Sequence, residues 1–198
     1  MIRKSLLVSA LAFASTGAFA APQTYQIDPS HTNVLFTWSH FGFSHPTGNF
    51  KDVGGTIVFD QENPTASKVD VTIPLSSLDT DVDDLDTHLR KADFFDAEKY
   101  PTITFKSTKI EKGAGDNRFN VTGDLTLHGV THPIVLDATL NKVGEMMGTR
   151  KIGFDATASV KRSDFGMGAY VPNISDEIPL RITTEAFIPE EKEKEAAE

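Results

Sequence analysis

Four of the six histidines stand in two closely spaced pairs, an arrangement that metal sites use. His40 and His45 flank an aromatic loop, whereas His128 and His132 flank a turn. Spacings of four and five residues can present two imidazoles to one metal ion. No cysteine accompanies them, and the second pair equally suits a turn. We therefore expect no metal and no cofactor.

The acidic run Asp79–Asp84 resembles a calcium-binding loop in composition only. It lacks the central glycine and the terminal glutamate that such a loop requires. Acidic residues also suit the start of a helix, where the helix dipole favours negative charge, and we favour that interpretation. The chain contains neither a Gly-x-Ser-x-Gly nucleophile motif nor a phosphate-binding glycine loop. We expect no catalytic residue and predict that the protein is not an enzyme.

Arg162 is a charged residue directly after an apolar stretch, with Asp164 and Phe165 beside it. An Arg–Asp pair would hold the following loop, while a guanidinium is equally suited to bind a phosphate or carboxyl head group. Both roles stay open at the level of sequence.

The elements that would position these residues are strands. From Phe119 to Leu140, apolar and polar residues alternate on both sides of Gly129–Val130. Period-two alternation around a glycine-containing turn is typical of an antiparallel hairpin with one dry and one wet face.

The same alternation recurs along the chain and predicts about eight strands. Between them, Ser76–Lys99 carries Val82, Leu85 and Leu89 at helical spacing, which predicts a short helical insertion. Eight antiparallel strands favour an all-β, up-and-down barrel or a closely related sandwich. A barrel of this size either fills with side chains or holds one small ligand.

The two ends of the chain differ from this pattern. Arg3 and Lys4 precede an apolar run from Leu6 to Phe19, which predicts a signal peptide over residues 1–20 with cleavage before Ala21. We expect the barrel domain over residues 21–188 and a charged, disordered tail over 189–198. The apolar run is too short for a comfortable membrane span, and no later segment is long enough. We thus expect an exported protein without a transmembrane segment.

The net charge of the chain argues against some classes of binding partner. Without residues 1–20 the chain has 17 basic and 28 acidic residues, a formal charge of 17 − 28 = −11. A surface this acidic argues against binding of nucleic acid and against docking on anionic lipid headgroups.

Several short motifs recur in the order found in one known family. They are Asp28-Pro29-Ser30-His31-Thr32, Gly48-Asn49-Phe50, Asp86-Thr87-His88-Leu89, Asp93-Phe94-Phe95-Asp96, Tyr100-Pro101, Gly123-Asp124-Leu125-Thr126-Leu127-His128-Gly129-Val130-Thr131 and Lys161-Arg162-Ser163-Asp164-Phe165-Gly166. With them the chain resembles the YceI-like family of polyisoprenoid-binding periplasmic proteins. The family often has arginine where this chain has Ser39.

The resemblance implies an eight-stranded antiparallel lipocalin-like barrel, a periplasmic location, an association with stress response and, in many members, a homodimer. It also implies a long apolar pocket for an isoprenoid or similar amphiphile. The function we predict is therefore sequestration and transport of such a ligand. An enzyme acting on a lipid or quinone-like substrate in the same cavity, or a structural stress protein with a filled core, are the alternatives.

Fourteen phenylalanines against three tyrosines and one tryptophan favour an apolar interior. Small residues on inward faces, such as Ala138 and Ala156, favour empty space within it, although a merely filled core is the alternative. We expect the mouth at Gly42–Gly48, Ser76–Lys99 or Ser163–Asp176. The predicted ligand-binding residues are Phe36, Trp38, His40, Phe43, Phe59, Phe94, Phe105, Leu125, Leu127, Ile134, Phe154, Arg162, Phe165 and Met167.

Overall fold

In the computed structural model, which describes residues 21–190, most of the chain forms strands. Apolar and polar residues alternate along these strands. The predicted signal peptide and residues 191–198 of the predicted tail lie outside this range. The strands are β1 (Gln23–Ile27), β2 (Asn33–Thr37), β3 (Thr47–Phe50), β4 (Gly54–Phe59), β5 (Lys68–Pro74), β6 (Leu78–Asp79), β7 (Thr102–Lys112), β8 (Arg118–Leu127), β9 (Val130–Met146), β10 (Thr149–Lys161) and β11 (Glu177–Phe187).

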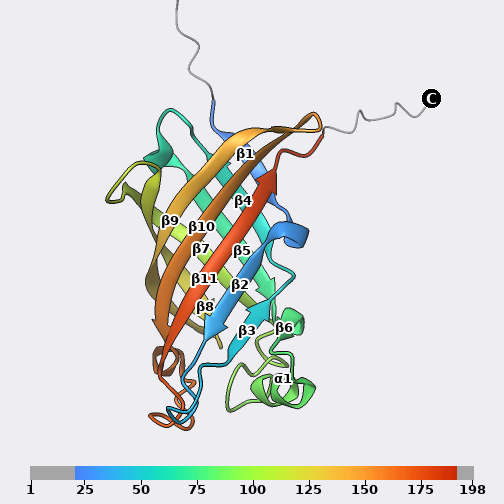
Figure 1. Cartoon of the computed structure of the whole chain (residues 1–198), viewed down its shortest axis with the longest axis vertical. Coiled ribbons are helices and arrows are strands. Elements are labelled where there is room, and N and C mark those ends of the chain that lie inside the picture. Colours follow the sequence, from blue (N-terminus) through green and yellow to red (C-terminus); the bar gives the residue numbers. More distant parts are fainter. Residues whose placement is uncertain (1–20, 191–198) are drawn as a thin grey trace, which may run out of the picture.

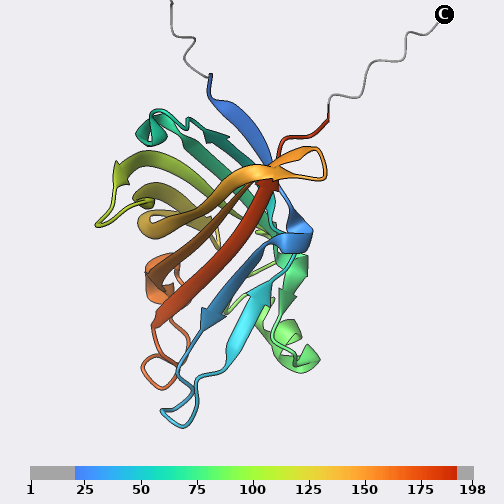
Figure 2. The same ribbon diagram turned by 45° about the horizontal axis from the view of Figure 1, so that its top comes forward.

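These segments form one antiparallel sheet that closes on itself (Figures 1 and 2). The ring runs β1-β4-β5-β7-β8-β9-β10-β11 and returns to β1. The three remaining strands, β2, β3 and β6, extend the same sheet. β2 pairs with β11, as β1 does, β3 pairs with β2, and β6 pairs with β3. The predicted eight-stranded antiparallel barrel is therefore confirmed.

Residues 51–53 separate β3 from β4. Just after the break, Gly55 has φ +135°, a conformation that other residues rarely adopt. A Cβ atom placed on Gly55 would lie 2.0 Å from the carbonyl oxygen of Asp70 on the neighbouring strand β5. Glycine at this position lets the two strand backbones approach closely at a bend of the barrel.

We expect Gly55→Ala to lower the free energy of unfolding by about 2 kcal/mol, because it adds both backbone strain and overlap with a neighbouring backbone. Gly148→Ala is the control, since Gly148 also has a positive φ but nothing lies within 4 Å of its added Cβ. Urea unfolding of both variants measures the difference. Equal losses for the two variants would show that close approach at Gly55 does not matter.

The predicted hairpin is confirmed as β8 and β9. Leu127 pairs with Val130 across a two-residue turn in which His128 (φ +53°) and Gly129 (φ +73°) both have positive φ. Positive φ at both central residues characterises the type I′ turn, whose twist matches that of the flanking strands.

A bulge at Thr108 changes which residues of β7 face inward. Ser107 pairs with Gly123 on β8, and Lys109 pairs with Thr122, so Thr108 is an extra residue. One extra residue reverses the alternation of faces. Phe105 and Ile110 consequently both face the interior although they are five positions apart, an odd spacing that would otherwise place them on opposite faces.

The predicted helical insertion is present as α1 (Asp83–Leu89), which lies at the lower end of the barrel in Figure 1. The buried carboxylate of Asp86 accepts hydrogen bonds from the backbone N–H and the hydroxyl of Thr80, at 2.8 and 2.6 Å. These bonds hold the start of α1 to the end of β6. Within residues 21–190, no helix is long and apolar enough to cross a membrane.

Candidate ligand-binding site

The barrel encloses a cavity. Its volume is about 160 Å³. One water molecule needs about 10–15 Å³ of such space, so the cavity has room for a molecule much larger than water. Along β8 it extends from Phe119 to Leu125, roughly 20 Å of strand at about 3.4 Å per residue.

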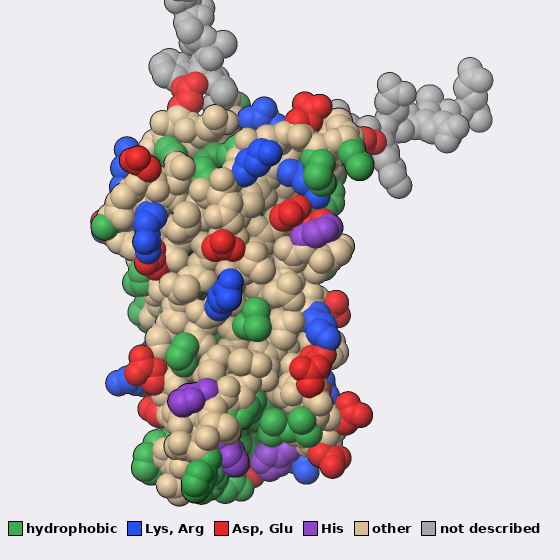
Figure 3. Space-filling model, viewed as in Figure 1, with side chains coloured by type: hydrophobic (Ala, Val, Ile, Leu, Met, Phe, Trp, Pro, Cys, Tyr) green, Lys and Arg blue, Asp and Glu red, His purple; other side chains and the backbone are tan. Residues whose placement is uncertain are grey.

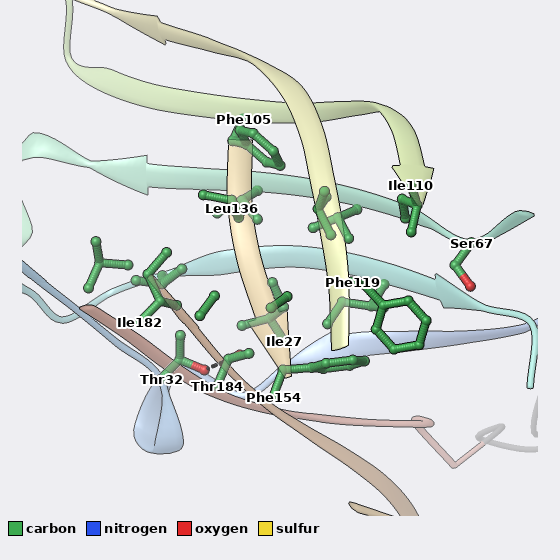
Figure 4. A pocket seen from close by; sticks show the side chains of 18 of the residues that line it. Ile27, Thr32, Ser67, Phe105, Ile110, Phe119, Leu136, Phe154, Ile182 and Thr184 are labelled. Carbon is green, nitrogen blue, oxygen red and sulfur yellow. Dashed lines mark hydrogen bonds between the residues drawn. The ribbon is translucent and has the colours of Figure 1, made fainter. Parts of the chain in front are cut away.

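The lining is apolar. Among the described residues that line the cavity, none is charged, and the hydroxyl side chains are Thr32, Ser67 and Thr184. The Thr32 and Thr184 hydroxyls are 2.8 Å apart and bond to each other, as Figure 4 shows. The Ser67 hydroxyl accepts a hydrogen bond from the backbone N–H of Asp60. Since these hydroxyls already have partners, the cavity suits a hydrocarbon chain.

Several inward-facing side chains are only half buried, because they border empty space. Phe154, Ile182 and Leu136 face the interior yet remain partly accessible. Ala138 on β9 pairs directly with Ala156 on β10, and both line the cavity. Two alanines at a cross-strand position leave room that larger side chains would fill.

One end of the barrel is closed by aromatic residues. The Phe36 ring stacks on Trp38 with centroids 5.8 Å apart and lies 5.3 Å from Phe50, which in turn contacts Phe95 at 5.9 Å. At the same end Phe165 is almost fully buried. These rings fill the barrel beside α1 and the two lower loops.

The cavity approaches the surface at the other end. Pro64 and Ser67, in the connection between β4 and β5, belong to its lining together with Ile110 and Phe119 near the β7–β8 connection. Both connections lie at the upper end in Figure 1. The loops predicted from sequence to form the mouth lie at the opposite, closed end, because the sequence pattern does not show which end the aromatic residues fill.

Five of the fourteen predicted ligand-binding residues line the cavity: Phe59, Phe105, Leu125, Ile134 and Phe154. They come from β4, β7, β8, β9 and β10, and the closure of the barrel brings them together. The T-shaped contact between Phe59 and Phe154, with centroids 6.1 Å apart, lies near the upper end.

The other nine predicted residues lie outside the cavity lining. They are Phe36, Trp38, His40, Phe43, Phe94, Leu127, Arg162, Phe165 and Met167. Of these, Phe36, Leu127, Phe165 and Met167 are buried at the closed end, and Phe43 is almost fully exposed. Direct contact of these nine residues with a ligand stays a prediction. The position of the cavity does not support it.

Arg162 is buried and its guanidinium is already bonded. It donates to the carbonyl oxygens of Ser175 (2.9 Å), Met167 (2.5 Å) and Ile174 (2.9 Å). Burial lowers the pKa of Arg162, and nearby Asp176 counteracts this. Arg162 thus fixes the Ser163–Asp176 loop through backbone carbonyls, and the Asp164 pairing considered from sequence is not among its contacts.

The remaining lining residues are mostly aliphatic, and the emphasis on aromatic residues left them out of the predicted ligand-binding set. Alternation identifies their faces, but their depth along the barrel axis depends on strand tilt and stagger. They are Ile27, Thr32, Val34, Val53, Ile57, Pro64, Ser67, Val69, Val71, Ile73, Ile110, Phe119, Val121, Leu136, Ala138, Ala156, Leu180, Ile182 and Thr184. Of these, Ala138 and Ala156 were predicted to face inward beside empty space, and both do line the cavity.

A polar cluster lies apart from the cavity where β1 ends. Donor atoms of Asp28, His31 and Glu185 lie within 4.8 Å of one another. The Lys151 ammonium approaches two of them, at 3.1 Å from Glu185 Oε2 and 3.9 Å from Asp28 Oδ2. A built-in cation therefore already lies beside the two carboxylates, and we interpret the cluster as an ion-pair network.

Asp28 gives this network a pH dependence. Partial burial raises the pKa of its carboxyl, but hydrogen bonds from His31 and Ser30 outweigh this and lower the pKa below the ordinary value. A carboxyl of this kind stabilises the fold above about pH 3.9, and the contribution is lost as pH falls through the lower folded pKa.

We expect Asp28→Asn to lower the free energy of unfolding by about 1 kcal/mol at pH 7, and the difference from wild type to shrink below about pH 4. Urea unfolding across this pH range measures it. Asp155→Asn, at an exposed position on β10, is the control. A difference that stays constant with pH would contradict the assignment.

The closed eight-stranded antiparallel barrel with an apolar hollow places the protein in the class of small ligand-enclosing β-barrels. The YceI-like domain matches residues 25–186, and the chain belongs to the YceI-like family. The resemblance found in the sequence motifs is thereby confirmed.

Two relatives illustrate the family, and one more distant structure shares the fold. The chain is 41% identical over 188 residues to "Protein YceI" of Shigella flexneri, covering 93% of this chain and 97% of that protein. The Campylobacter jejuni YCEI protein is 39% identical with a TM-score of 0.68, covering 75% of this chain and 88% of that one. A polyisoprenoid binding domain from Saccharophagus degradans shares the fold at 18% identity and a TM-score of 0.66, covering 83% of this chain and 98% of that one.

Proposed function

We propose that the barrel binds one long-chain isoprenoid, or a similar amphiphile, and carries it through the periplasm. The observation that carries this proposal is the hollow interior. Among the described residues that line it, none is charged. The description of the Saccharophagus degradans domain as polyisoprenoid-binding supports the choice of ligand class.

The energetics of burial are adequate for tight binding. Each buried methylene group contributes about 0.8 kcal/mol, so ten of them contribute roughly 8 kcal/mol. Ordering a flexible chain offsets part of this gain. Because the end beside α1 is closed, the apolar tail enters first and the head group stays near Pro64 and Ser67.

We propose no catalytic role. Within the described lining there is no histidine, carboxylate, lysine, tyrosine or cysteine that could transfer a proton or attack a substrate. Retention of an intact ligand, without turnover, is the behaviour this lining supports.

Mass spectrometry of a solvent extract of the purified protein tests the proposal. We expect about one isoprenoid or comparable amphiphile per barrel. Absence of any extracted lipid, together with no affinity for an apolar fluorescent probe, would rule out the carrier function. Such a result would favour the alternative of a structural stress protein with a filled core.

The periplasmic setting rests on the predicted signal peptide. Cell fractionation with determination of the N-terminus tests it, and a mature protein beginning at Ala21 in the periplasmic fraction is expected. Light scattering of the same preparation tests the homodimer that the family resemblance implies.

A further inference from the structure

Two loops at the closed end of the barrel expose aromatic side chains to solvent. Phe41 and Phe43 lie in the loop between β2 and β3, and Tyr170 and Val171 lie in the loop before β11. Their exposed fractions are 52%, 91%, 61% and 39%. We call these four residues the aromatic tip. Both loops project from the lower end of the barrel in Figures 1 and 2, and hydrophobic side chains gather at that end in Figure 3.

The two loops are bonded to each other and form one unit. The Phe41 N–H donates to the carbonyl oxygen of Asn173 at 2.7 Å, and the Ser175 N–H donates to that of Ser39 at 3.1 Å. The Tyr170 ring also stacks on Phe94, with centroids 6.2 Å apart. The aromatic tip is thus held in place by backbone pairing and by packing against the segment that follows α1.

Two of the exposed aromatic residues occupy unfavourable backbone conformations. Phe41 has φ +53° and Tyr170 has φ +63°. Bulky residues rarely adopt the left-handed region, where glycine or asparagine is more favourable. An aromatic side chain that is both strained and exposed stabilises the isolated protein little, which indicates a role in contact with something else.

The aromatic tip also lacks charge. The chain has no Asp, Glu, Lys or Arg from Trp38 to Phe50 or from Phe165 to Ser175, although charged residues make up 24% of the sequence. A protein partner that recognised a side of the barrel would meet the charged outer faces of the strands. A protruding aromatic tip without charge instead suits the interface of a bilayer, where tyrosine rings lie at headgroup level and phenylalanine side chains bury at the boundary with the acyl chains.

We propose that the aromatic tip inserts into the headgroup region of a zwitterionic lipid bilayer and docks the barrel on the membrane with its closed end down. The formal charge of −11 without residues 1–20 opposes binding to anionic headgroups, so the partner is a lipid surface without net charge. Binding of this kind depends on buried apolar area and responds weakly to salt. It does not require a ligand in the cavity, so its failure would leave the carrier proposal intact.

Flotation with phosphatidylcholine vesicles tests the proposal. The protein is used from Ala21 onward, because residues 21–190 contain the complete barrel and the apolar run Leu6–Phe19 would itself bind lipid. We expect wild type to float with the vesicles at low and high salt, and to float less when phosphatidylglycerol is added. Phe43→Ser should lower the partition coefficient about tenfold or more.

Met147→Ser is the matched control. Met147 is 97% exposed in the hairpin between β9 and β10, at the opposite end of the barrel, and its loss should leave flotation unchanged. Three outcomes would overturn the proposal: no flotation of wild type, an equal effect of both variants, or unchanged flotation of Phe43→Ser. A change of oligomeric state in Phe43→Ser without loss of flotation would assign the aromatic tip to a second copy of the chain.

Discussion

Ala156→Phe will strongly weaken retention of the ligand without lowering the stability of the barrel. Ala156 faces the cavity opposite Ala138, and the added ring would occupy space that the ligand needs. We expect the amount of extracted lipid and the affinity for an apolar fluorescent probe to fall about tenfold or more, which corresponds to roughly 1.4 kcal/mol or more of binding free energy. The melting temperature should stay the same or rise, because the ring fills a void.

Measuring both the melting temperature and the lipid content of Ala156→Phe distinguishes an empty interior from a filled one. In a core that is already full, an added ring would force neighbouring side chains apart and destabilise the fold by about 1–3 kcal/mol. Thr157→Phe places the same ring at the next position, which is exposed on the outer face of β10 and should change neither quantity. A lower melting temperature with unchanged lipid content would show that the interior is filled and that the ligand binds elsewhere.

Arg162→Met will destabilise the protein by roughly 3 kcal/mol, the largest loss of stability that we expect from a single side chain. The substitution removes the donors to the carbonyl oxygens of Ser175, Met167 and Ile174 while keeping most of the side-chain volume. Each buried acceptor left without a partner costs about 1–3 kcal/mol, and water can reach those that are partly exposed. For a domain of this size the melting temperature should fall by about 6–12 °C.

The same variant separates the two roles that the sequence left open for Arg162. Lys161→Met, which removes an exposed charge one residue earlier, is the control for charge. Arg162→Lys should restore little stability, because an ammonium cannot reproduce the planar fork of a guanidinium. Hydrogen exchange of the Met167 N–H, which donates to the carbonyl of Arg162, should accelerate in Arg162→Met. Normal stability with weaker ligand binding would instead show that Arg162 contacts the head group.

The amino-acid sequence by itself determined the local elements of this protein. Alternation from Phe119 to Leu140 predicted the β8–β9 hairpin, and the spacing of Val82, Leu85 and Leu89 predicted the helix, because both patterns depend on local periodicity alone. The ordered motifs indicated the family. The hairpin, the helix and the family motifs can be predicted without knowing which distant segments of the chain contact each other.

Only the tertiary structure decided where the cavity lies. Phe36 and Phe105 show the same apolar alternation in sequence, yet Phe36 closes one end and Phe105 lines the hollow. Their depth is set by the tilt and stagger of the strands, and the bulge at Thr108 reverses the inward face of β7 within a single strand. Alternation specifies the face of a strand on which a side chain lies, but not its position along the barrel axis. The side chains that fill the interior or leave it empty at a given depth come from different strands, and only closure of the sheet brings them together.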